Sequence, residues 1–317
     1  MFKRQTSGSV VCSRCGRLVG VQDERCYNCG KWNPGLWGFA PLLGRFARDL
    51  GFADVVVGGC VVLYLLSLLL APSQIGMGGI FSLLSPGMEP LRLLGMSGAI
   101  PIFLDGRWWT VLSAAWLHGG VLHILFNMLW IRQLAPPIGH LFGISRLVII
   151  YTVSSITGFA LTSLMGGPAL LEGLRHVPPE LLPLPLRLLE ALPLPLLPGP
   201  FQGAVFTVGA SAPLFGLFGA LYLYGQRSGN QMIGRQYLQF AVVWLVIGLF
   251  AGGMIRIDNW AHLGGFAGGY LTARWLDPLR PEKPEHSIAA LVCLVLTVLS
   301  IVASVVHGLS GGLHPLR

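Results

Sequence analysis

The stretch from Asp54 to Ala71, DVVVGGCVVLYLLSLLLA, carries a single charged residue, at its first position. A helix needs about 20 apolar residues to cross the hydrocarbon core of a bilayer, which is about 30 Å thick. Six further stretches of this kind follow, at 114–135, 145–165, 204–225, 236–255, 258–276 and 287–307. Because lipid offers the backbone no hydrogen-bond partners, apolar runs this long are expected to be helices. The sequence therefore predicts an all-α polytopic membrane protein, a helical bundle with seven transmembrane segments.

The composition of the whole chain agrees with this prediction. Of its 317 residues, 53% are hydrophobic and only 11% are charged, and the mean hydropathy is +0.68. Soluble domains carry about a quarter of their residues as Asp, Glu, Lys or Arg. The chain lacks the polar surface of a soluble enzyme, and the same composition disfavours collagen, disordered chains and disulfide-rich secreted scaffolds.

Lys and Arg are distributed unevenly between the two sides of the expected spans. If the N-terminus is cytoplasmic, the N-terminal segment and the alternate loops hold 8, 2, 2 and 3 of these residues, which is 15 of the 21. The positive-inside rule then predicts a cytoplasmic N-terminus in a plasma or bacterial inner membrane, with Arg317 outside. The net charge of +8 is spread along the membrane boundary. Because a nucleic-acid-binding protein gathers its charge on one face, no nucleic-acid partner is expected.

Two CxxC pairs stand near the N-terminus: Cys12 with Cys15, and Cys26 with Cys29. Ten residues separate the pairs and a glycine follows each of them, which is the spacing of a four-cysteine zinc ribbon. The alternatives are two disulfides, which a reducing cytoplasm disfavours, and a redox CxxC site, which needs a βαβ context. We predict a ribbon at residues 1–35 with a structural Zn²⁺, followed by a linker at 36–53.

Polar side chains at hydrocarbon depth are costly and usually functional. The acidic residues nearest the spans, Asp54, Asp258 and Asp277, lie at predicted span ends. No carboxylate is therefore expected inside the membrane, which disfavours a metal transporter that uses the histidines. The polar residues that remain within the spans are His118, His123, Asn127, Ser211, Asn259 and His262.

The segment 116–130, WLHGGVLHILFNMLW, holds three of these polar residues. His123 and Asn127 are four residues apart and so share one helix face, while His118 precedes the flexible Gly119-Gly120 pair. One interpretation is hydrogen bonding to neighbouring helices, which membrane bundles use. The other is a role in catalysis, and this segment alone leaves both open.

Ser211 stands two residues before Pro213. Proline favours the first turn of a helix, so a helix is expected to begin beside Ser211. The 16 residues from there to Arg227 rise only about 24 Å. Ser211 is therefore expected below the outer membrane surface, next to the unpaired amides of a helix N-terminus. The same helix carries a stripe of small residues, Ala212, Gly216 and Ala220. Such a stripe lets another helix approach closely, although serine is also a common packing residue in such a place.

The sixth span is expected to pack on the small-residue stripe of the fourth, because His262 is followed by the glycine pairs Gly264/Gly268 and Gly265/Gly269. Two helices faced with small residues bring their backbones together, which places Ser211 beside His262. A neutral imidazole activates a serine hydroxyl by taking its proton. With no carboxylate expected at that depth, the third member of a triad is missing, and the pair is a Ser–His dyad. His123 and Asn127 then act as donors to the developing oxyanion.

Three segments in this order resemble the motifs of the rhomboid family of intramembrane serine proteases: HGGVLHILFN at 118–127, GASAPLFGLFGA at 209–220 and AHLGGFAGG at 261–269. The resemblance covers residues 54–277 and implies a rhomboid-like bundle of six helices. It implies that Ser211 is the nucleophile and His262 the general base.

The same resemblance assigns the supporting residues. His123 and Asn127, with the backbone amide of Ser211, are the implied oxyanion donors. Phe215 occupies the place of the aromatic residue that packs against the catalytic histidine, and His118 is expected to be a structural hydrogen-bonding residue.

Two residues depart from the family pattern. The GxSG motif is here Gly209-Ala210-Ser211-Ala212, and alanine in the last position is a small change that we expect to be tolerated. The Trp-Arg motif of the first outer loop is similar to Trp108-Trp109-Thr110. Thr110 thus replaces the arginine, which puts the internal anchoring of that loop in doubt.

Two segments extend beyond the six-helix pattern. Residues 166–203 form a Pro- and Leu-rich insertion, in which the prolines are expected to break any continuous helix. We expect this segment to lie on the outer face at the membrane interface, either biasing substrate entry or, as we favour, serving as an apolar elaboration. An additional transmembrane helix at 285–310 agrees with the six-plus-one version of the fold.

The resemblance implies an intramembrane serine endopeptidase that needs no catalytic cofactor. Its substrates are expected to be transmembrane or juxtamembrane segments of membrane proteins within the lipid bilayer. The alternative is a proteolytically inactive rhomboid-like protein that binds or chaperones membrane proteins. Such a protein typically lacks the serine or the histidine, and both Ser211 and His262 are present here.

Overall fold

The structure is a computed structural model of the chain, and it describes residues 5–12, 14–38, 51–198, 201–250 and 257–311. Residues 39–50 of the predicted linker lie outside this part of the chain, as does Arg317, for which an outer position is predicted.

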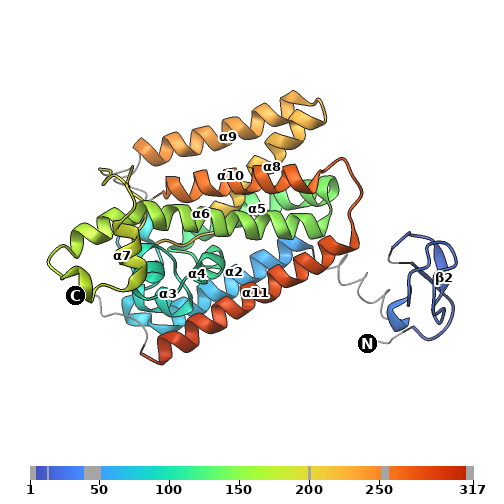
Figure 1. Ribbon diagram of the computed structural model, residues 1–317, viewed down its shortest axis with the longest axis horizontal. Coiled ribbons are helices and arrows are strands. Elements are labelled where there is room, and N and C mark those ends of the chain that lie inside the picture. The colour runs from blue at the N-terminus through green and yellow to red at the C-terminus, as the bar shows by residue number, and fades with distance from the viewer. Residues whose placement is uncertain (1–4, 13, 39–50, 199–200, 251–256, 312–317) are drawn as a thin grey trace.

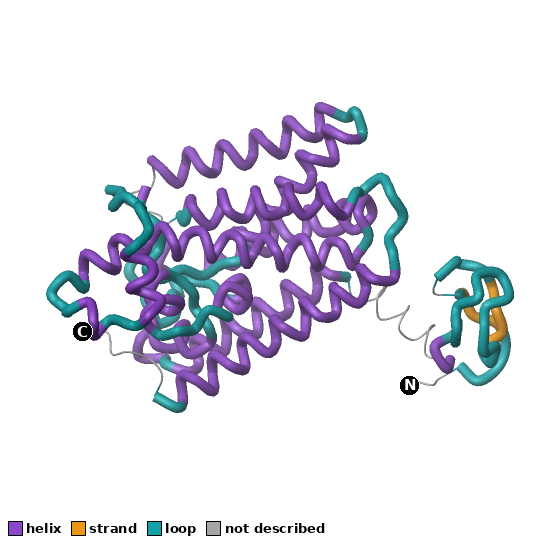
Figure 2. The backbone as a smooth tube through the Cα atoms, in the orientation of Figure 1, coloured by secondary structure: helices purple, strands orange, loops and turns teal. Residues whose placement is uncertain are grey.

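The N-terminal segment forms a two-stranded antiparallel sheet of β1 (Ser9–Val11) and β2 (Leu18–Gly20), followed by the 3-10 turn η1 (Leu36–Gly38) (Figure 2). Val10 pairs with Val19, and both side chains face a core that includes Cys12 and Cys26. A module of this size cannot bury enough apolar surface to be stable without a further constraint such as a metal.

Helices make up most of the remaining chain (Figure 1). They are α2 (Phe52–Leu70), α3 (Met88–Leu94), α4 (Thr110–Ser113), α5 (Val121–Phe142), α6 (Ile144–Gly173), α7 (Leu184–Glu190), α8 (Ser211–Arg227), α9 (Gln231–Phe250), α10 (Asn259–Leu276) and α11 (Pro284–Leu309). The 3-10 turns are η2 (Pro72–Gln74), η3 (Ile80–Ser82), η5 (Ala114–Trp116) and η6 (Pro179–Leu181), and η4 (Ile100–Leu104) is a short π-helical turn.

Several of these helices suit a membrane by length and composition. Four of them, α2, α6, α9 and α11, are each long and apolar enough to cross a bilayer, and the bent pair 110–116 and 121–142 adds a fifth candidate. α8 and α10 correspond to the fourth and sixth predicted spans, but they have only 17 and 18 residues. Their glycines pack against other helices and lower their mean hydropathy. The chain is a multi-pass integral membrane protein.

The second predicted span begins later than expected. Instead of one helix from residue 114, the chain forms the short helix α4 and the turn η5, and α5 starts at Val121 after a bend of 94°. The break falls at Gly119-Gly120, where Gly120 adopts an extended conformation as the N-cap residue. Pro136 and Pro137 lie inside α5.

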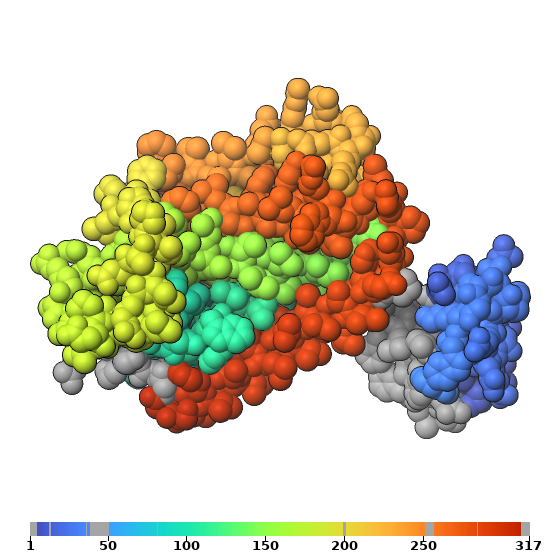
Figure 3. All heavy atoms as spheres, in the orientation of Figure 1, coloured from blue at the N-terminus to red at the C-terminus, as the bar shows by residue number. Residues whose placement is uncertain are grey.

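The helix of the third predicted span is longer than expected and includes the first residues of the predicted insertion. α6 continues through Pro168 to Gly173, so the first part of the segment 166–203 is helical. The segment then turns back, and Leu182, Leu186 and Leu189 pack on a cluster with Leu170. Figure 3 shows the yellow-green part of the chain, which includes this segment, beside the teal part near residues 100–110. Buried leucine packing therefore holds the insertion against the bundle despite its prolines.

The fourth helix begins at Ser211, as Pro213 predicts. Residues 204–210, which were assigned to the span, precede the helix as an extended segment in which Thr207 pairs with Ser97. Backbone pairing with another loop satisfies hydrogen bonds that a helix would otherwise provide.

The predicted close approach of α8 and α10 is confirmed. A Cβ atom at Gly265 would overlap the carbonyl oxygen of Ala212, and one at Gly269 would overlap that of Gly216. The other glycine face of α10 meets Thr157 of α6, and Figure 1 shows α6 and α10 side by side. α8 and α10 thus approach backbone to backbone, and small side chains of α6 fill the space beside them.

Candidate active site

The turn before α8 depends on one glycine. Gly209 has a φ of 135°, which favours glycine, and its amide donates a hydrogen bond to the Ala114 carbonyl at 2.9 Å. A Cβ atom at Gly209 would lie 2.6 Å from His123 Nε2 and 3.6 Å from Ser211 Oγ. The turn therefore brings the edge of the His123 ring next to the serine at the start of α8.

Ser211 and His262 lie on the first turns of two tightly packed helices. The ring of Phe215, one turn after Ser211, stacks on His262 with a centroid distance of 3.9 Å and an interplanar angle of 8°. His262 is 5% exposed. In the part of the chain that the structure describes, no hydrogen bond joins Ser211 Oγ to His262, and His262 Nδ1 is buried without a partner. Catalytic hydrogen bonds are often loose in the resting state of an enzyme.

The alanine that replaces the last glycine of the serine motif, Ala212, packs opposite a glycine of α6. Ala212 is fully buried, and a Cβ atom at Gly158 of α6 would lie 2.8 Å from the Ala212 Cβ and 2.6 Å from the Ala261 carbonyl oxygen. The space for the extra methyl group of Ala212 exists because α6 has a glycine opposite. This agrees with the expectation that the alanine is tolerated.

His123 has a defined hydrogen-bond arrangement. Its Nδ1 accepts a hydrogen bond from the Gly119 amide at 3.4 Å. In the neutral imidazole that this implies, Nε2 carries the proton. The Nε2–H group is then a donor beside Gly209 and close to the serine.

Asn127 is the second predicted oxyanion donor. It is 5% exposed, and its Nδ2 is buried with no hydrogen-bond partner among the described residues. A buried amide donor without an acceptor costs about 1–3 kcal/mol. The Asn127 side-chain amide is therefore a hydrogen-bond donor that is free to bind an acceptor at this place in the bundle.

His118 lies behind His123. It is fully buried, and the two rings meet edge to face at 5.1 Å. Neither of its nitrogens has a hydrogen-bond partner within the residues described. Its ring packs against His123, and the structural hydrogen-bonding role expected of it stays a prediction.

Asp258 is a residue whose role the sequence analysis missed. It caps α10, and its Oδ1 accepts hydrogen bonds from the Ala261 amide at 3.0 Å and from Thr162 Oγ1 at 2.7 Å. Its Oδ2 accepts from Thr207 Oγ1 at 2.8 Å. An Asp just before an apolar helix is a recognisable N-cap signal, but its two threonine partners lie far away in the sequence.

The four predicted metal ligands come together. Their sulfur atoms all lie within 4.8 Å of one another, with Cys12 to Cys29 at 3.7 Å and Cys15 to Cys26 at 3.6 Å. Zinc–sulfur bonds of about 2.3 Å in a tetrahedron put neighbouring sulfurs about 3.8 Å apart, so the cluster fits a metal ion. These separations are too long for disulfides.

The ribbon backbone supports this cluster. The glycine after each CxxC pair has a positive φ, 73° at Gly16 and 70° at Gly30, and donates its amide to the carbonyl of the first cysteine of its pair. The backbone amide of Arg17, with the Asn28 side chain, lowers the pKa of the Cys15 thiol to about 6. Burial and the neighbouring thiols raise the pKa of Cys29 to about 11, so the four thiols do not all favour the thiolate before a metal binds.

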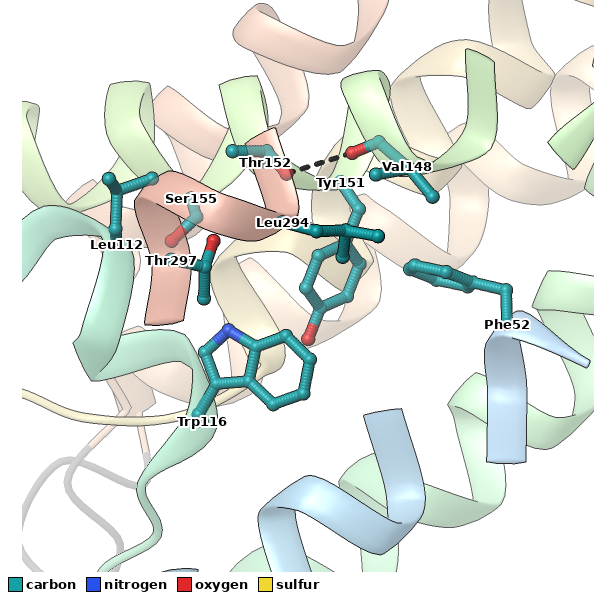
Figure 4. Close-up of a pocket in the computed structure, with 9 residues that line it drawn as sticks. All are labelled: Phe52, Leu112, Trp116, Val148, Tyr151, Thr152, Ser155, Leu294 and Thr297. Carbon is teal, nitrogen blue, oxygen red and sulfur yellow. Dashed lines mark hydrogen bonds between the residues drawn. The ribbon is translucent and has the colours of Figure 1, made fainter. Parts of the chain in front are cut away.

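A small cavity lies elsewhere in the bundle, between α2, α4, α6 and α11 (Figure 4). Its volume of about 10 Å³ is close to the minimum for one water molecule. Phe52, Trp116 and Tyr151 are among the residues that line it, and the Tyr151 hydroxyl is buried without a partner among the described groups. None of the predicted catalytic residues lines it, so this cavity is not the candidate active site.

The fold and these motifs define a polytopic membrane protein that carries Ser211 and His262 at the starts of two glycine-packed helices. The model of the rhomboid domain matches residues 105–277, more than half of the 317 residues. The chain belongs to the rhomboid family.

Individual relatives agree with this assignment. The chain is 29% identical over 170 residues to rhomboid protease GlpG of Serratia proteamaculans, which covers 53% of this chain and 48% of that protein. It is 27% identical over 173 residues to rhomboid protease GluP of Bacillus subtilis, covering 54% and 27%. It is also 28% identical over 191 residues to RHOMBOID-like protein 5 of Arabidopsis thaliana, covering 59% and 50%. The chain thus spans about half or less of the length of these relatives.

Proposed function

We propose that this protein is an intramembrane serine endopeptidase that cleaves transmembrane or juxtamembrane segments of other membrane proteins. The observation that carries the proposal is the contact between the first turns of α8 and α10, where Phe215 stacks on His262 one helical turn from Ser211. Its family membership and the protease names of two relatives support the same class of reaction.

In the proposed first step, His262 takes the proton of Ser211 as its Oγ attacks the substrate carbonyl carbon. The negative charge that develops on the carbonyl oxygen is stabilised by His123 Nε2–H, Asn127 Nδ2–H and the Ser211 amide. The amide at the first position of a helix has no intrahelical acceptor, and it lies at the positive end of the helix dipole.

In the second step, the tetrahedral intermediate collapses, the C–N bond breaks, and His262 returns the proton to the leaving amine. Water then attacks the acyl-enzyme with His262 as the base, which releases the acid and restores Ser211. No carboxylate orients the imidazole in this scheme, because His262 Nδ1 has no hydrogen-bond partner among the described residues. Stacking on Phe215 holds the ring instead.

A serine-directed fluorophosphonate probe tests this proposal on the full-length protein in lipid vesicles. We expect covalent labelling at Ser211, identified by peptide mass mapping, and no labelling in Ser211→Ala. Ser67→Ala is the matched control, because Ser67 is a buried serine whose hydroxyl bonds to the Tyr64 carbonyl of its own helix. Wild-type protein that is folded but remains unlabelled would contradict the proposal.

We also propose that the N-terminal segment faces the cytoplasm. The support is the excess of Lys and Arg on that side, 15 of the 21 in the chain, since cytoplasmic loops carry such an excess. Ser7 and Ser73 are both exposed, and they lie before and after the first span. The test uses intact cells that carry Ser7→Cys or Ser73→Cys in chains without other cysteines. A membrane-impermeant cysteine reagent should modify position 73 and leave position 7 unmodified. Modification of position 7 alone would reverse the orientation.

We further propose that the four-cysteine cluster holds a structural Zn²⁺, because a closed set of four cysteine sulfurs is typical of structural zinc sites. Metal analysis of the purified protein should give one zinc per chain, and Cys15→Ser should lose it. Since metal binding and folding are coupled in small modules, hydrogen exchange in β1 and β2 should accelerate while α8 and α10 keep their protection. A slowly exchanging ribbon in metal-free protein would disprove the site.

A further inference from the structure

The last helix of the bundle, α11, presents a buried polar group to the first outer loop. Ser304 is fully buried, and its hydroxyl accepts a hydrogen bond from Trp109 Nε1 at 3.1 Å. Its carbonyl oxygen accepts one from Arg107 Nη2 at 3.2 Å. Trp109 also meets His307 of α11 edge to face at 5.8 Å. These contacts join residues that are almost 200 positions apart in the chain.

Arg107 links α11 to a second buried element of the loop. It is fully buried, and its Nη1 donates to the Arg92 carbonyl at the end of α3 at 2.7 Å. Arg92 in turn forms a buried ion pair with Asp105 at 3.1 Å. Burial lowers the pKa of Arg107 to about 10, so the guanidinium remains charged at neutral pH. Two carbonyl oxygens accept from its terminal nitrogens, and the nearby Asp105 charge favours the charged form, while its Nε is buried without a partner among the described residues.

The loop continues from this anchor to the strand-like segment before Ser211. Thr110 Oγ1 donates its hydrogen to the Arg107 carbonyl at 2.8 Å and lies 3.2 Å from Ser97 Oγ. Ser97 exchanges two backbone hydrogen bonds with Thr207, at 3.1 and 2.8 Å. Two residues further on, the Gly209 amide bonds to the Ala114 carbonyl, immediately after α4. Thr110, which replaces the arginine of the family motif, is therefore part of the loop's anchoring, and Arg107 supplies the guanidinium.

The same segment connects to the helix that carries His262. Thr207 donates to the Asp258 carboxylate, which caps α10 one turn before His262. A continuous set of polar contacts thus runs from Ser304 through the outer loop to Thr207, and from Thr207 to both the serine turn and the histidine helix.

We propose that α11 positions the Ser211–His262 pair through this chain of contacts, with Arg107 as the principal positioning residue. This inference rests on the proposed protease function. A displacement of a reacting group by about 1 Å costs on the order of 100-fold in rate, so the position of the serine turn matters to the reaction. A purely structural role for Arg107 would lower stability and leave the reactivity of each folded molecule unchanged.

The test compares Arg107→Met, Ser304→Ala and the control Ser300→Ala. Ser300 lies on the same helix, is also buried, and its hydroxyl bonds to the Thr297 carbonyl of α11 itself. Fluorophosphonate inactivation of full-length protein in vesicles is followed as kinact and KI, each per folded molecule. We expect kinact to fall about tenfold in Arg107→Met, by a smaller factor in Ser304→Ala and not in Ser300→Ala, with KI unchanged in all three.

A second readout does not depend on catalysis. Hydrogen exchange of the peptide that contains Gly209 should accelerate in Arg107→Met and Ser304→Ala, because its amide relies on the Ala114 carbonyl that the loop holds. Ser300→Ala should exchange as the wild type does. The positioning proposal is overturned if kinact per folded Arg107→Met molecule equals that of wild type, or if exchange at Gly209 is unchanged. An unlabelled wild type would instead remove the proposed protease function, while the exchange data would still report on the contacts between α11 and the serine turn.

Ser304→Ala is also the milder variant, which protects the test against a failure of Arg107→Met to fold. Trp109→Phe removes the indole N–H that donates to the Ser304 hydroxyl. In a double-mutant cycle the two changes should be non-additive in kinact, because residues in direct contact couple. Additive effects would show that Ser304 and Trp109 act separately and would contradict the proposed route.

Discussion

Cleavage of a single-pass transmembrane reporter in vesicles is expected to fall by a factor of about 10⁴ or more in Ser211→Ala and to a similar level in His262→Ala, as for other serine hydrolase nucleophiles and bases. The double variant should be scarcely slower than either single one. The reason is that the hydroxyl and the imidazole act as one unit: without its base the serine is a weak nucleophile, and without the serine the base has no proton to take. The measurement is the turnover rate per folded molecule.

The packing alternative makes the opposite prediction. If Ser211 and His262 only fill space between α8 and α10, both single variants should cleave the reporter as fast as Ser67→Ala, and their losses of thermal stability should add. His262→Ala should in any case lower the melting temperature, because removing the ring leaves Phe215 without its stacking partner and opens a cavity. Rates per folded molecule therefore have to be compared, because the total cleavage activity falls both when the chemistry is lost and when less protein is folded. Full activity of Ser211→Ala with labelling of another serine would end the dyad proposal.

The parts of this site that local sequence rules determine were predictable. Pro213 marks the start of α8 at Ser211, and the spacing of Gly265 and Gly269 marks the face of α10 that meets α8. Each of these signals is contained within a few residues of one helix. For the same reason the CxxC spacing was enough to bring Cys12, Cys15, Cys26 and Cys29 together.

Other features depend on contacts between distant segments, and the sequence patterns did not reveal them. Thr207 holds an extended segment where a helix was expected, because its backbone pairs with Ser97. Pro168 is tolerated inside α6, whose far end packs on the leucines of α7. The replacement of the family arginine by Thr110 put the anchoring of this loop in doubt, but Arg107, three residues earlier, donates a hydrogen bond to the Ser304 carbonyl of α11. In each case a tertiary contact outweighs the local propensity.

Asn127→Ala is expected to slow turnover of the reporter by about 10²–10³, the usual effect of losing one oxyanion donor. The bundle should remain folded. His123→Ala should lower the rate similarly, because its Nε2–H is the donor beside Gly209. His118→Ala, by contrast, should act mainly on thermal stability, because His118 is a fully buried ring whose observed contact is with His123.

Asn127→Leu separates the catalytic role of this residue from a structural one. Leucine has a similar volume and no polar atoms, and the Nδ2 group that it replaces is buried without a partner in the described structure. If Asn127 stabilised the bundle by hydrogen bonding, the variant would lose stability. Because the donor is unsatisfied in the resting protein, its removal should instead leave the melting temperature unchanged or raise it, while turnover falls as in Asn127→Ala. The rest of the fold has to offset the free-energy cost of burying the unsatisfied Nδ2 group. The oxyanion is the acceptor that would satisfy this group during the reaction. A wild-type rate in Asn127→Leu would show that the oxyanion has other donors and would remove Asn127 from the mechanism, with the dyad left intact.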